Sequence, residues 1–369
     1  MKDSLYRLAD DTRRLVADNP IRKRRTRRIQ ADRLPRQYPA QAERLVILLV
    51  PGLDKVNGGI LSIASIYGET QRLRDVHGAE TILCTVPGDP LLLRFSKFHN
   101  SNDIFEFSRV LRYFRQLEVL TIHVPEYPVG RFLSHLTPED RERLSQIAEV
   151  RLNLLMQNIS LVPPSTDVAR LKELGAVTCT TAHAKYSTPE FRASIGVPLH
   201  MLSVFNSPEQ YERRSYGRKE DLMIVSPDDH PRKRLVLNRL GHDLPGLRVQ
   251  VVKKLTYEEY KQLITRAKWA LTFGEGLDGY FLETVLSGGI SFAVYNARFH
   301  TEDFRGLRTV YATYDALVAN ISKDIAALDN PAAYTGYQQE QFELCSRYYR
   351  HDEYVENLRR FYEGRYTFP

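Results

Sequence analysis

Apolar stretches of strand length alternate with amphipathic stretches of helix length along most of this chain. Each apolar stretch is nearly continuous, which is typical of strands with two buried faces, and such strands occur in parallel sheets covered by helices on both sides. Eleven stretches fit this description, at 44–52, 80–87, 117–124, 152–159, 176–181, 198–204, 222–226, 247–252, 269–273, 290–296 and 307–313. The alternation therefore predicts an α/β protein.

Eleven strands are many for one open sheet, and a polar segment at 207–221 interrupts the alternation. We therefore expect two doubly wound, Rossmann-like domains, at 44–206 and 207–333. A basic arm at 1–43 precedes them, and a helical, aromatic-rich tail at 334–369 follows them. Ligands of open α/β sheets bind at the carboxyl ends of the strands, so the functional residues should directly follow strands.

Composition and local signals favour a cytoplasmic protein. Cys84, Cys179 and Cys345 are odd in number and far apart, which indicates a reducing compartment rather than a disulfide framework or a cysteine metal site. The longest apolar runs are far shorter than the roughly 20 residues that span a bilayer. The first residues are rich in aspartate and lack the apolar centre of a secretion signal.

The net charge of +7 is concentrated at the N-terminus. Residues 1–36 contain 12 Lys and Arg against 5 Asp and Glu, and the remainder, with 40 of each kind, is neutral. The densest cluster is Arg22–Arg28, and apolar residues at helical spacing precede it (Leu5, Leu8, Ala9, Leu15 and Val16). Three interpretations stay open: peripheral docking on an anionic membrane surface, binding of another acidic partner, and a solvated arm or a helix packed on the body. Because the body is neutral, nucleic acid is not expected as a partner.

The stretch 271–296, LTFGEGLDGYFLETVLSGGISFAVYN, allows two interpretations. Gly274, Gly276 and Gly279 have the G-x-G-x-x-G spacing of a dinucleotide-binding turn. That spacing comes late in the chain, however, and no acidic residue ends the next strand to hold a ribose. Glu275 between the first two glycines would also repel a pyrophosphate. We therefore disfavour a redox enzyme.

The alternative interpretation rests on two carboxylates, Glu275 and Glu283, which are separated by seven residues. Glu275 follows a strand, the turn from Gly276 to Gly279 allows close backbone approach, and Glu283 lies about one turn into the next helix. The helix N-terminus favours an anionic or oxygen-rich ligand. A carboxylate at position 283 can accept both hydroxyls of a ribose.

This segment resembles the E-x7-E region of the retaining glycosyltransferases of family 4. The resemblance extends over roughly 44–330 and implies the glycosyltransferase-B fold, in which two doubly wound domains face each other across a cleft, the first on the acceptor side and the second on the donor side. It implies that Glu275 contacts the donor sugar and Glu283 the nucleoside ribose. The backbone around Gly276, Leu277, Asp278 and Gly279 would approach the sugar and diphosphate. The tail would cross back to brace the first domain.

The segment 222–240 supports the same interpretation. Arg232, Lys233 and Arg234 crowd the start of a helix, where cations oppose the helix dipole unless an anionic ligand lies among them. Family 4 enzymes hold the donor diphosphate with an Arg and a Lys after this strand. We assign that role to Arg232 and Lys233, although the Gly that usually follows the Lys is absent here.

Candidate residues in the first half of the chain also follow strands. Asn57, Gly58 and Gly59 resemble the glycine loop that lies under the donor phosphates and acceptor in this fold. His183 resembles the Thr-x-His segment near the reacting sugar. Two further substrate-binding candidates complete the predicted site: His123 and Asn158.

The sequence contains no D-x-D motif, the motif through which metal-dependent sugar transferases of the other major fold bind their ion. We therefore expect no metal and no cofactor, with cations neutralising the leaving group instead. The expected function is transfer of a sugar from a nucleotide-sugar donor to a saccharide or lipid-linked glycan, with retention implied by the resemblance. A nucleotide-sugar-binding protein without transfer activity and a sugar-nucleotide epimerase of the same fold remain alternatives.

Overall fold

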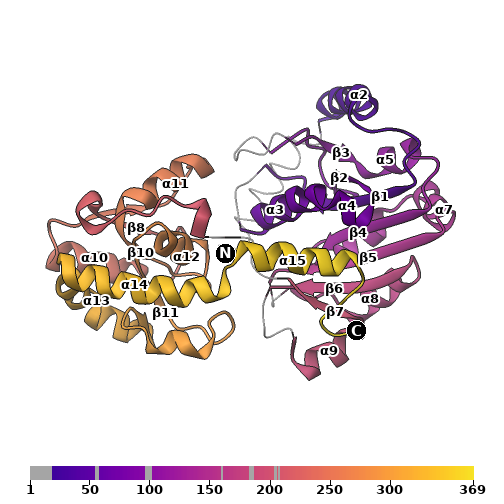
Figure 1. Ribbon diagram of the computed structural model, residues 1–369. Coiled ribbons are helices and arrows are strands. Elements are labelled where there is room, and N and C mark those ends of the chain that lie inside the picture. Colours follow the sequence, from indigo (N-terminus) through magenta and orange to yellow (C-terminus); the bar gives the residue numbers. More distant parts are fainter. Residues whose placement is uncertain are drawn as a thin grey trace. The chain divides into compact units, whose positions relative to one another are not determined.

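The computed structural model describes residues 19–54, 58–95, 102–158, 161–182, 187–202, 206 and 208–369. The chain forms two compact units: unit 1 contains Met1–Leu202 and Val355–Pro369, and unit 2 contains Ser203–Tyr354. Each unit is built around one parallel sheet (Figure 1). The predicted α/β class with two Rossmann-like domains is confirmed.

The sheet of unit 1 has seven strands in the order β3-β2-β1-β4-β5-β6-β7. The order runs outward from β1 in both directions, as in a doubly wound fold. The strands are β1 (Arg44–Val50), β2 (Glu80–Thr85), β3 (Ile104–Glu106), β4 (Val119–Pro125), β5 (Glu149–Met156), β6 (Ala176–Thr181) and β7 (Leu199–Met201). The sequence did not predict β3, because three residues are too short to show a period.

Helices cover both faces of this sheet. On β1, Leu45, Ile47 and Leu49 join the core formed with one set of helices: α5 (Phe107–Tyr113), α6 (Val129–His135), α7 (Pro138–Ser145), α8 (Ser165–Lys172) and α9 (Pro189–Ile195). The alternate residues Val46 and Leu48 are equally buried and point to the opposite face. That face is covered by α3 (Gly58–Arg72), α4 (Arg74–His77) and the end of α15 (His351–Tyr362).

The C-terminal segment Val355–Pro369 is part of unit 1. The Tyr362 hydroxyl hydrogen-bonds His123 Nε2 and Thr70 Oγ1, both at 2.9 Å. Phe368 then pairs with Leu199 of β7 in an antiparallel bridge. The tail expected at 334–369 consists of two helices, and the first, α14 (Pro331–Tyr348), belongs to unit 2.

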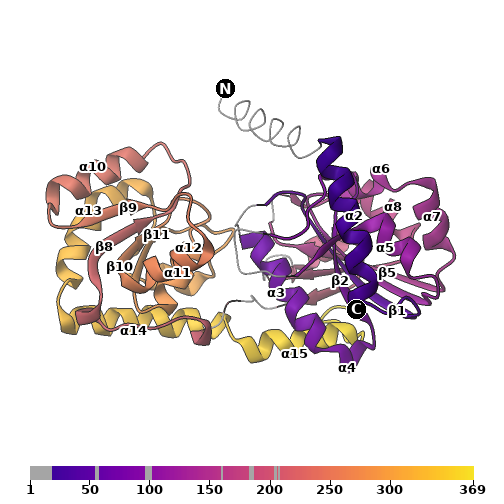
Figure 2. The ribbon, with the colours of Figure 1, turned by 90° about the horizontal axis from the view of Figure 1, so that it is seen from above.

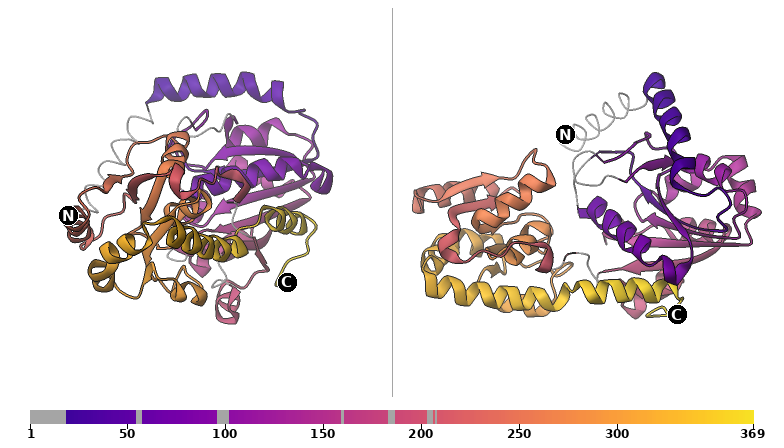
Figure 3. Two further views of the ribbon diagram at one scale, coloured as in Figure 1. Left: turned by 60° about the vertical axis from the view of Figure 1, so that its left-hand side comes forward. Right: turned by 45° about the horizontal axis from the view of Figure 1, so that its top comes forward.

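Helix α2 (Pro20–Gln37) lies against β3, the edge strand of unit 1 (Figures 2 and 3). It begins where Asn19 accepts a hydrogen bond from the Ile21 amide at 2.9 Å. The Gln30 amide group donates to the Ile104 carbonyl at 2.8 Å and accepts from the Glu106 amide at 3.3 Å, which satisfies part of the strand edge. The basic segment is thus a packed helix over residues 20–37, whereas the amphipathic helix predicted before it lies outside the described residues.

The sheet of unit 2 has five parallel strands in the order β12-β11-β10-β8-β9. The strands are β8 (Glu220–Val225), β9 (Arg248–Val251), β10 (Ala267–Leu271), β11 (Ile290–Val294) and β12 (Val310–Tyr311). The helices are α10 (Lys233–Asp243), α11 (Tyr257–Arg266), α12 (Gly279–Leu286), α13 (Tyr314–Leu328) and α14. Short 3₁₀ helices are η3 (Pro208–Gln210), η4 (Tyr216–Arg218) and η5 (Glu302–Gly306).

Alternate residues of β8 enter two different cores. Leu222 and Ile224 pack in the core that contains α11 and α12, whereas Met223 and Val225 pack in the core that contains α10 and α13. This two-sided burial explains why the strand is a continuous apolar run in the sequence. None of the helices in the described ranges is both long and apolar enough to cross a membrane.

Candidate functional site

The site in unit 2 forms where β8 and β10 end. The two strands are parallel neighbours, with Val225 opposite Leu271, so the loops that follow them meet at one edge of the sheet. The Phe273 amide donates to Ser226 Oγ at 3.0 Å and joins the two loops. These loops contain five of the residues that the sequence singled out: Arg232, Glu275, Gly276, Leu277 and Asp278.

Helix α12 starts at this edge, and Asp278 caps it. Its Oδ1 accepts from the Phe281 amide at 3.1 Å, and the Thr272 hydroxyl donates to its Oδ2. Burial raises the pKa of Asp278 to about 7. Both carboxyl oxygens of Asp278 are therefore used within the protein, where they hold the loop against the start of α12. The contribution of Asp278 to a ligand site is the loop conformation that it fixes.

Glycine is required at Gly276 of this turn, and a side chain at Gly279 would be tightly packed. Gly276 has φ +89°, and a Cβ there would lie 2.4 Å from His300 Cε1 and 2.9 Å from the Val294 carbonyl oxygen. A Cβ on Gly279 would lie 3.3 Å from Glu283 Oε1. The space that these glycines leave is thus filled by the protein's own groups, a histidine from beyond β11 and the second predicted carboxylate.

Glu283 is buried in α12, with 4% of its surface exposed. Its Oε1 accepts a long hydrogen bond of 3.5 Å from Asn206 Nδ2, and within the described part of the chain its buried Oε2 has no well-formed hydrogen bond. Burial raises the pKa of Glu283 to about 8, and the hydroxyls of Tyr211 and Tyr260 oppose that rise. A buried carboxyl with an unsatisfied oxygen is costly, which marks this position as a candidate ligand site.

Glu275 is half-buried and lies among other acids. Burial raises the pKa of Glu275, and the Asp228 carboxylate raises it further. A Cβ on Gly274 would lie 2.9 Å from Asp228 Oδ2, so Asp228 reaches across from the β8 loop. The carboxyl groups of Asp228, Glu275 and Asp278 interact electrostatically. A cation or a hydroxyl donor bound beside them would therefore be stabilised.

The basic residues are present at the start of α10, as expected. Lys233 Nζ donates to the Ser226 carbonyl at 2.5 Å and to the Asp228 carbonyl at 2.8 Å. An ammonium group has three donors, so one remains for a ligand. Arg232 pairs with Asp315 at 2.8 Å on the surface, and Arg234 is exposed. Burial lowers the pKa of Lys233, and the Asp228 carboxylate opposes this.

Sequence analysis missed an aromatic stack at the same edge. The His230 ring lies 3.7 Å from the Tyr314 ring, at an interplanar angle of 20°. The Tyr314 hydroxyl donates to the Phe273 carbonyl at 3.2 Å. His230 lies two residues before Arg232 in a polar loop, so the sequence could have indicated it as a site residue. Tyr314 is distant in the sequence and could not have been found in this way.

The predicted residues of unit 1 divide into two groups. Gly58 and Gly59 start α3, and the Gly59 carbonyl accepts from Gln157 Nε2 at 3.2 Å. The Asn158 amide donates to Glu126 Oε1 at 2.8 Å. These contacts bring the loops after β1, β4 and β5 together. Asn57 and His183 lie outside the described residues.

His123 does not follow its strand, as the sequence suggested, but lies within β4. It is 1% exposed, and its ring nitrogens contact Asn153 Nδ2 and the Tyr362 hydroxyl, both at 2.9 Å. Burial lowers its pKa to about 3. Both nitrogens are occupied inside unit 1, which fits a structural residue rather than a substrate ligand.

Glu126, which directly follows β4, is a buried acid that sequence analysis had not selected. It is 3% exposed, and its Oε2 has no hydrogen-bond partner in the described part of the chain. Burial raises its pKa to about 7. A short polar segment after an apolar strand was the only sequence signal.

No protein-family model matches this sequence, and no curated protein matches it. Solved structures do match. The Anabaena protein HepE, in complex with UDP and glucose, has a TM-score of 0.58 at 10% identity, over 87% of this chain and 99% of that chain. Sucrose-phosphate synthase from Thermosynechococcus elongatus has a TM-score of 0.53 at 10% identity, over 87% and 98% of the two chains.

At these identities the likeness defines the fold. The two parallel-sheet units, in this order and over nearly the full length of both matched chains, are those of the glycosyltransferase-B fold. The HepE structure has also been solved with UDP-glucose, again with a TM-score of 0.58 at 10% identity.

Proposed function

We propose that the protein is a glycosyltransferase that moves a sugar, most simply a hexose, from a nucleotide-sugar donor to a saccharide or lipid-linked glycan in the cytoplasm. The observation that carries this proposal is the buried Glu283 carboxyl behind the Gly276–Gly279 turn, whose Oε2 has no well-formed hydrogen bond within the described part of the chain. A ribose supplies two adjacent hydroxyl donors, which match such a carboxylate. The fold of the solved nucleotide-sugar complexes supports the same assignment.

In the proposed reaction, the bond between the sugar C1 and the donor phosphate oxygen breaks, and a bond from C1 to an acceptor hydroxyl oxygen forms. The acceptor proton leaves with the nucleoside diphosphate or to solvent. Glu275 holds hydroxyls of the donor sugar, and Lys233 and Arg232 stabilise the charge that develops on the diphosphate. We propose retention of configuration and no metal requirement as parts of the same mechanism.

The Lys233→Ala variant is expected to lower donor affinity or turnover about tenfold or more, because it removes a charge-assisted contact to the diphosphate. Lys323→Ala, which changes an exposed lysine of α13 in the same unit, is the matched control. Donor titration and initial rates measure both. Since Lys233 also ties the loop carbonyls together, melting curves must accompany the rates; equal kinetics for the two variants would contradict the assigned role.

A panel of UDP-, GDP-, dTDP- and CMP-linked sugars in a thermal-shift assay tests the proposed function. A ligand that binds only the folded state raises the melting temperature, by an amount that grows with its concentration above Kd. Hits are then incubated with glycan acceptors, with and without EDTA. Glycoside formation that is insensitive to EDTA is the expected result. Interconversion of the free donor without acceptor would support an epimerase instead, and binding without turnover would support a binding protein.

A further inference from the structure

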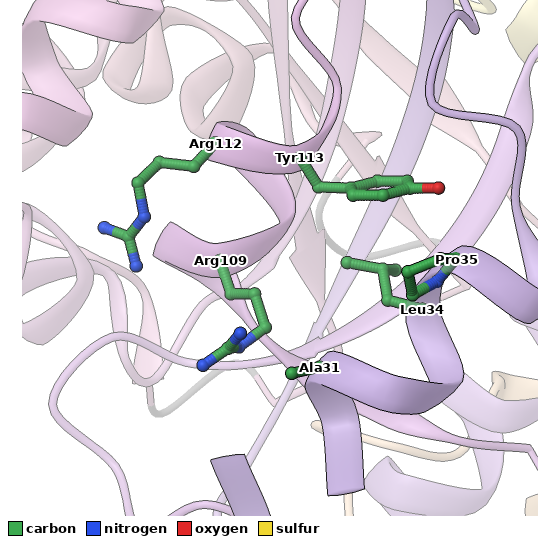
Figure 4. Close-up of a pocket in the computed structure, with 6 residues that line it drawn as sticks. All are labelled: Ala31, Leu34, Pro35, Arg109, Arg112 and Tyr113. Carbon is green, nitrogen blue, oxygen red and sulfur yellow. The ribbon is translucent and has the colours of Figure 1, made fainter. Parts of the chain in front are cut away.

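A groove lies between α2 and α5 in unit 1, far along the chain from the residues assigned above (Figure 4). It is lined by Ala31, Leu34, Pro35, Arg109, Arg112 and Tyr113. Figure 4 shows the Tyr113 ring over Leu34 and Pro35, and the Arg109 side chain directed toward Ala31. Arg109 Nε is buried and has no hydrogen-bond partner among the described residues. The guanidinium group of Arg109 thus lines the groove with a positive charge that its described neighbours satisfy only in part.

The basic residues of α2 form two groups, those paired with acids of unit 1 and those that are exposed without such a partner in the described part of the chain. On the packed side, Arg27 pairs with Glu106, and Arg33 pairs with Asp103 at 2.5 Å. A second group consists of five exposed cations that have no ion-pair partner in the part of the chain that the structure describes: Arg22, Lys23, Arg24, Arg25 and Arg28. Arg27 and Arg33 therefore tie α2 to unit 1, whereas the five exposed cations form no such contact in the described part of the chain.

The exposed cations are continuous with the groove. Arg24, Arg28, Ala31 and Pro35 follow one another at helical spacings of four, three and four, so they lie along one stripe of α2. Across the groove, α5 contributes Arg109 and the exposed Arg112. Arg115 lies two residues beyond the end of α5 and is also exposed. We call these cations together the α2–α5 face.

Among the described residues, few acids neutralise the positive charge of the α2–α5 face. Hydrogen bonds from its own backbone amide and from Thr137 lower the pKa of Glu139, and Arg112 contributes least to that shift. Asp32 is paired with Arg36 within α2 at 2.7 Å. The first turn of α2 contains no acid and includes Arg22 and Lys23, an arrangement that opposes the helix dipole. An external anionic surface would relieve this repulsion.

The chemistry of the face favours a lipid surface over nucleic acid. Ile21, at the start of the same helix, is 79% exposed, and an apolar side chain beside cations suits the headgroup region of a bilayer. Stacking platforms for bases are lacking in the described part of this face, because the ring of Tyr113 packs on α2 and its hydroxyl donates to the Tyr38 carbonyl at 2.8 Å.

We propose that the α2–α5 face docks the protein on an anionic membrane surface, with a lipid phosphate in the groove at Arg109 and Arg112. This inference does not depend on the proposed transfer reaction. It gives the membrane contact a defined location, on the outer side of α2 and across the groove to α5.

The test is flotation of the full chain with vesicles of phosphatidylcholine containing about one third phosphatidylglycerol, against pure phosphatidylcholine. Binding is expected only to the anionic vesicles and should weaken as salt rises. Arg24→Ala with Arg28→Ala is expected to weaken vesicle binding about 25-fold, because each surface cation contributes about fivefold. Arg109→Ala with Arg112→Ala should weaken vesicle binding similarly, although neither residue belongs to the basic cluster Arg22–Arg28.

The matched control removes two exposed cations from unit 2, Arg218→Ala with Lys323→Ala, and should float like the unmodified protein. Melting curves establish that each variant is folded, and donor-induced thermal shifts should be unchanged. Flotation of both test variants equal to that of the unmodified protein would overturn the proposal. So would tight binding to a DNA or RNA oligonucleotide without flotation, and so would full loss of binding in 10 mM inorganic phosphate at constant ionic strength, which would indicate a site for free phosphate.

Discussion

Replacement of Glu283 by Gln is expected to weaken binding of the nucleotide-sugar donor at least tenfold and, at the same time, to stabilise the folded protein at pH 8. The variant keeps the shape of the side chain and removes its charge. The ligand loses a charge-assisted acceptor for its ribose hydroxyls. The protein loses the unfavourable ionisation of a buried carboxyl.

The sign of the stability effect follows from linkage. The pKa of Glu283 is raised from 4.5 to about 8 in the folded protein. Between these values the folded state binds a proton that the unfolded state has released, so this residue makes stability fall as pH rises from about 4.5 to about 8. Asp278 and Glu126, with pKa values near 7, contribute in the same direction. Comparison with Glu283→Gln isolates the contribution of Glu283. The free energy of unfolding of the variant should depend less on pH than that of the unmodified protein.

Donor affinity has the opposite pH dependence. Ribose hydroxyls favour the ionised carboxylate, so affinity in the unmodified protein should rise by about tenfold between pH 6 and pH 8.5. In Glu283→Gln this rise should largely disappear. Titration calorimetry and denaturant unfolding at several pH values measure both properties, with Glu340→Gln, an exposed residue of α14, as the control. A variant that is less stable than the unmodified protein at pH 8 and binds donor equally well would show that Glu283 is only a packing residue.

Gly276→Ala is expected to lower the free energy of unfolding by about 2 kcal/mol or more and to abolish the donor-induced thermal shift. A φ of +89° is strained for any residue with a Cβ, and here that Cβ would meet His300 Cε1 at 2.4 Å and a backbone carbonyl at 2.9 Å. The loop between β10 and α12 must then move, and the positions of Glu275 and Asp278 move with it.

Gly246→Ala provides the control for Gly276→Ala, because nothing lies within 4 Å of a Cβ at that position and its φ is not in the left-handed region. Its stability should equal or slightly exceed that of the unmodified protein. A Gly276→Ala variant with normal stability and donor affinity would mean that the turn can adjust without moving its acids, and the geometry proposed for the site would then be wrong.

The sequence alone determined the fold class and the edge of each sheet at which the candidate residues lie. Burial on both faces makes a strand a continuous apolar run, and that property is local to each strand, so β1, β4 and β8 could be recognised from their own residues. The same argument placed Glu275 and Lys233 after strands of unit 2. It also placed His123 at the end of a strand, but that strand continues for two residues beyond His123, to Pro125.

Only the tertiary structure decided what surrounds these residues. The missing Cβ of Gly276 is replaced by His300, which comes from beyond the next strand, and His123 is held by Tyr362, 239 residues away. Two basic residues of α2, Arg27 and Arg33, are likewise neutralised by acids in or beside β3. Such contacts depend on which helix packs against which strand, and a local pattern of residue types contains no information about a partner that is distant in the sequence.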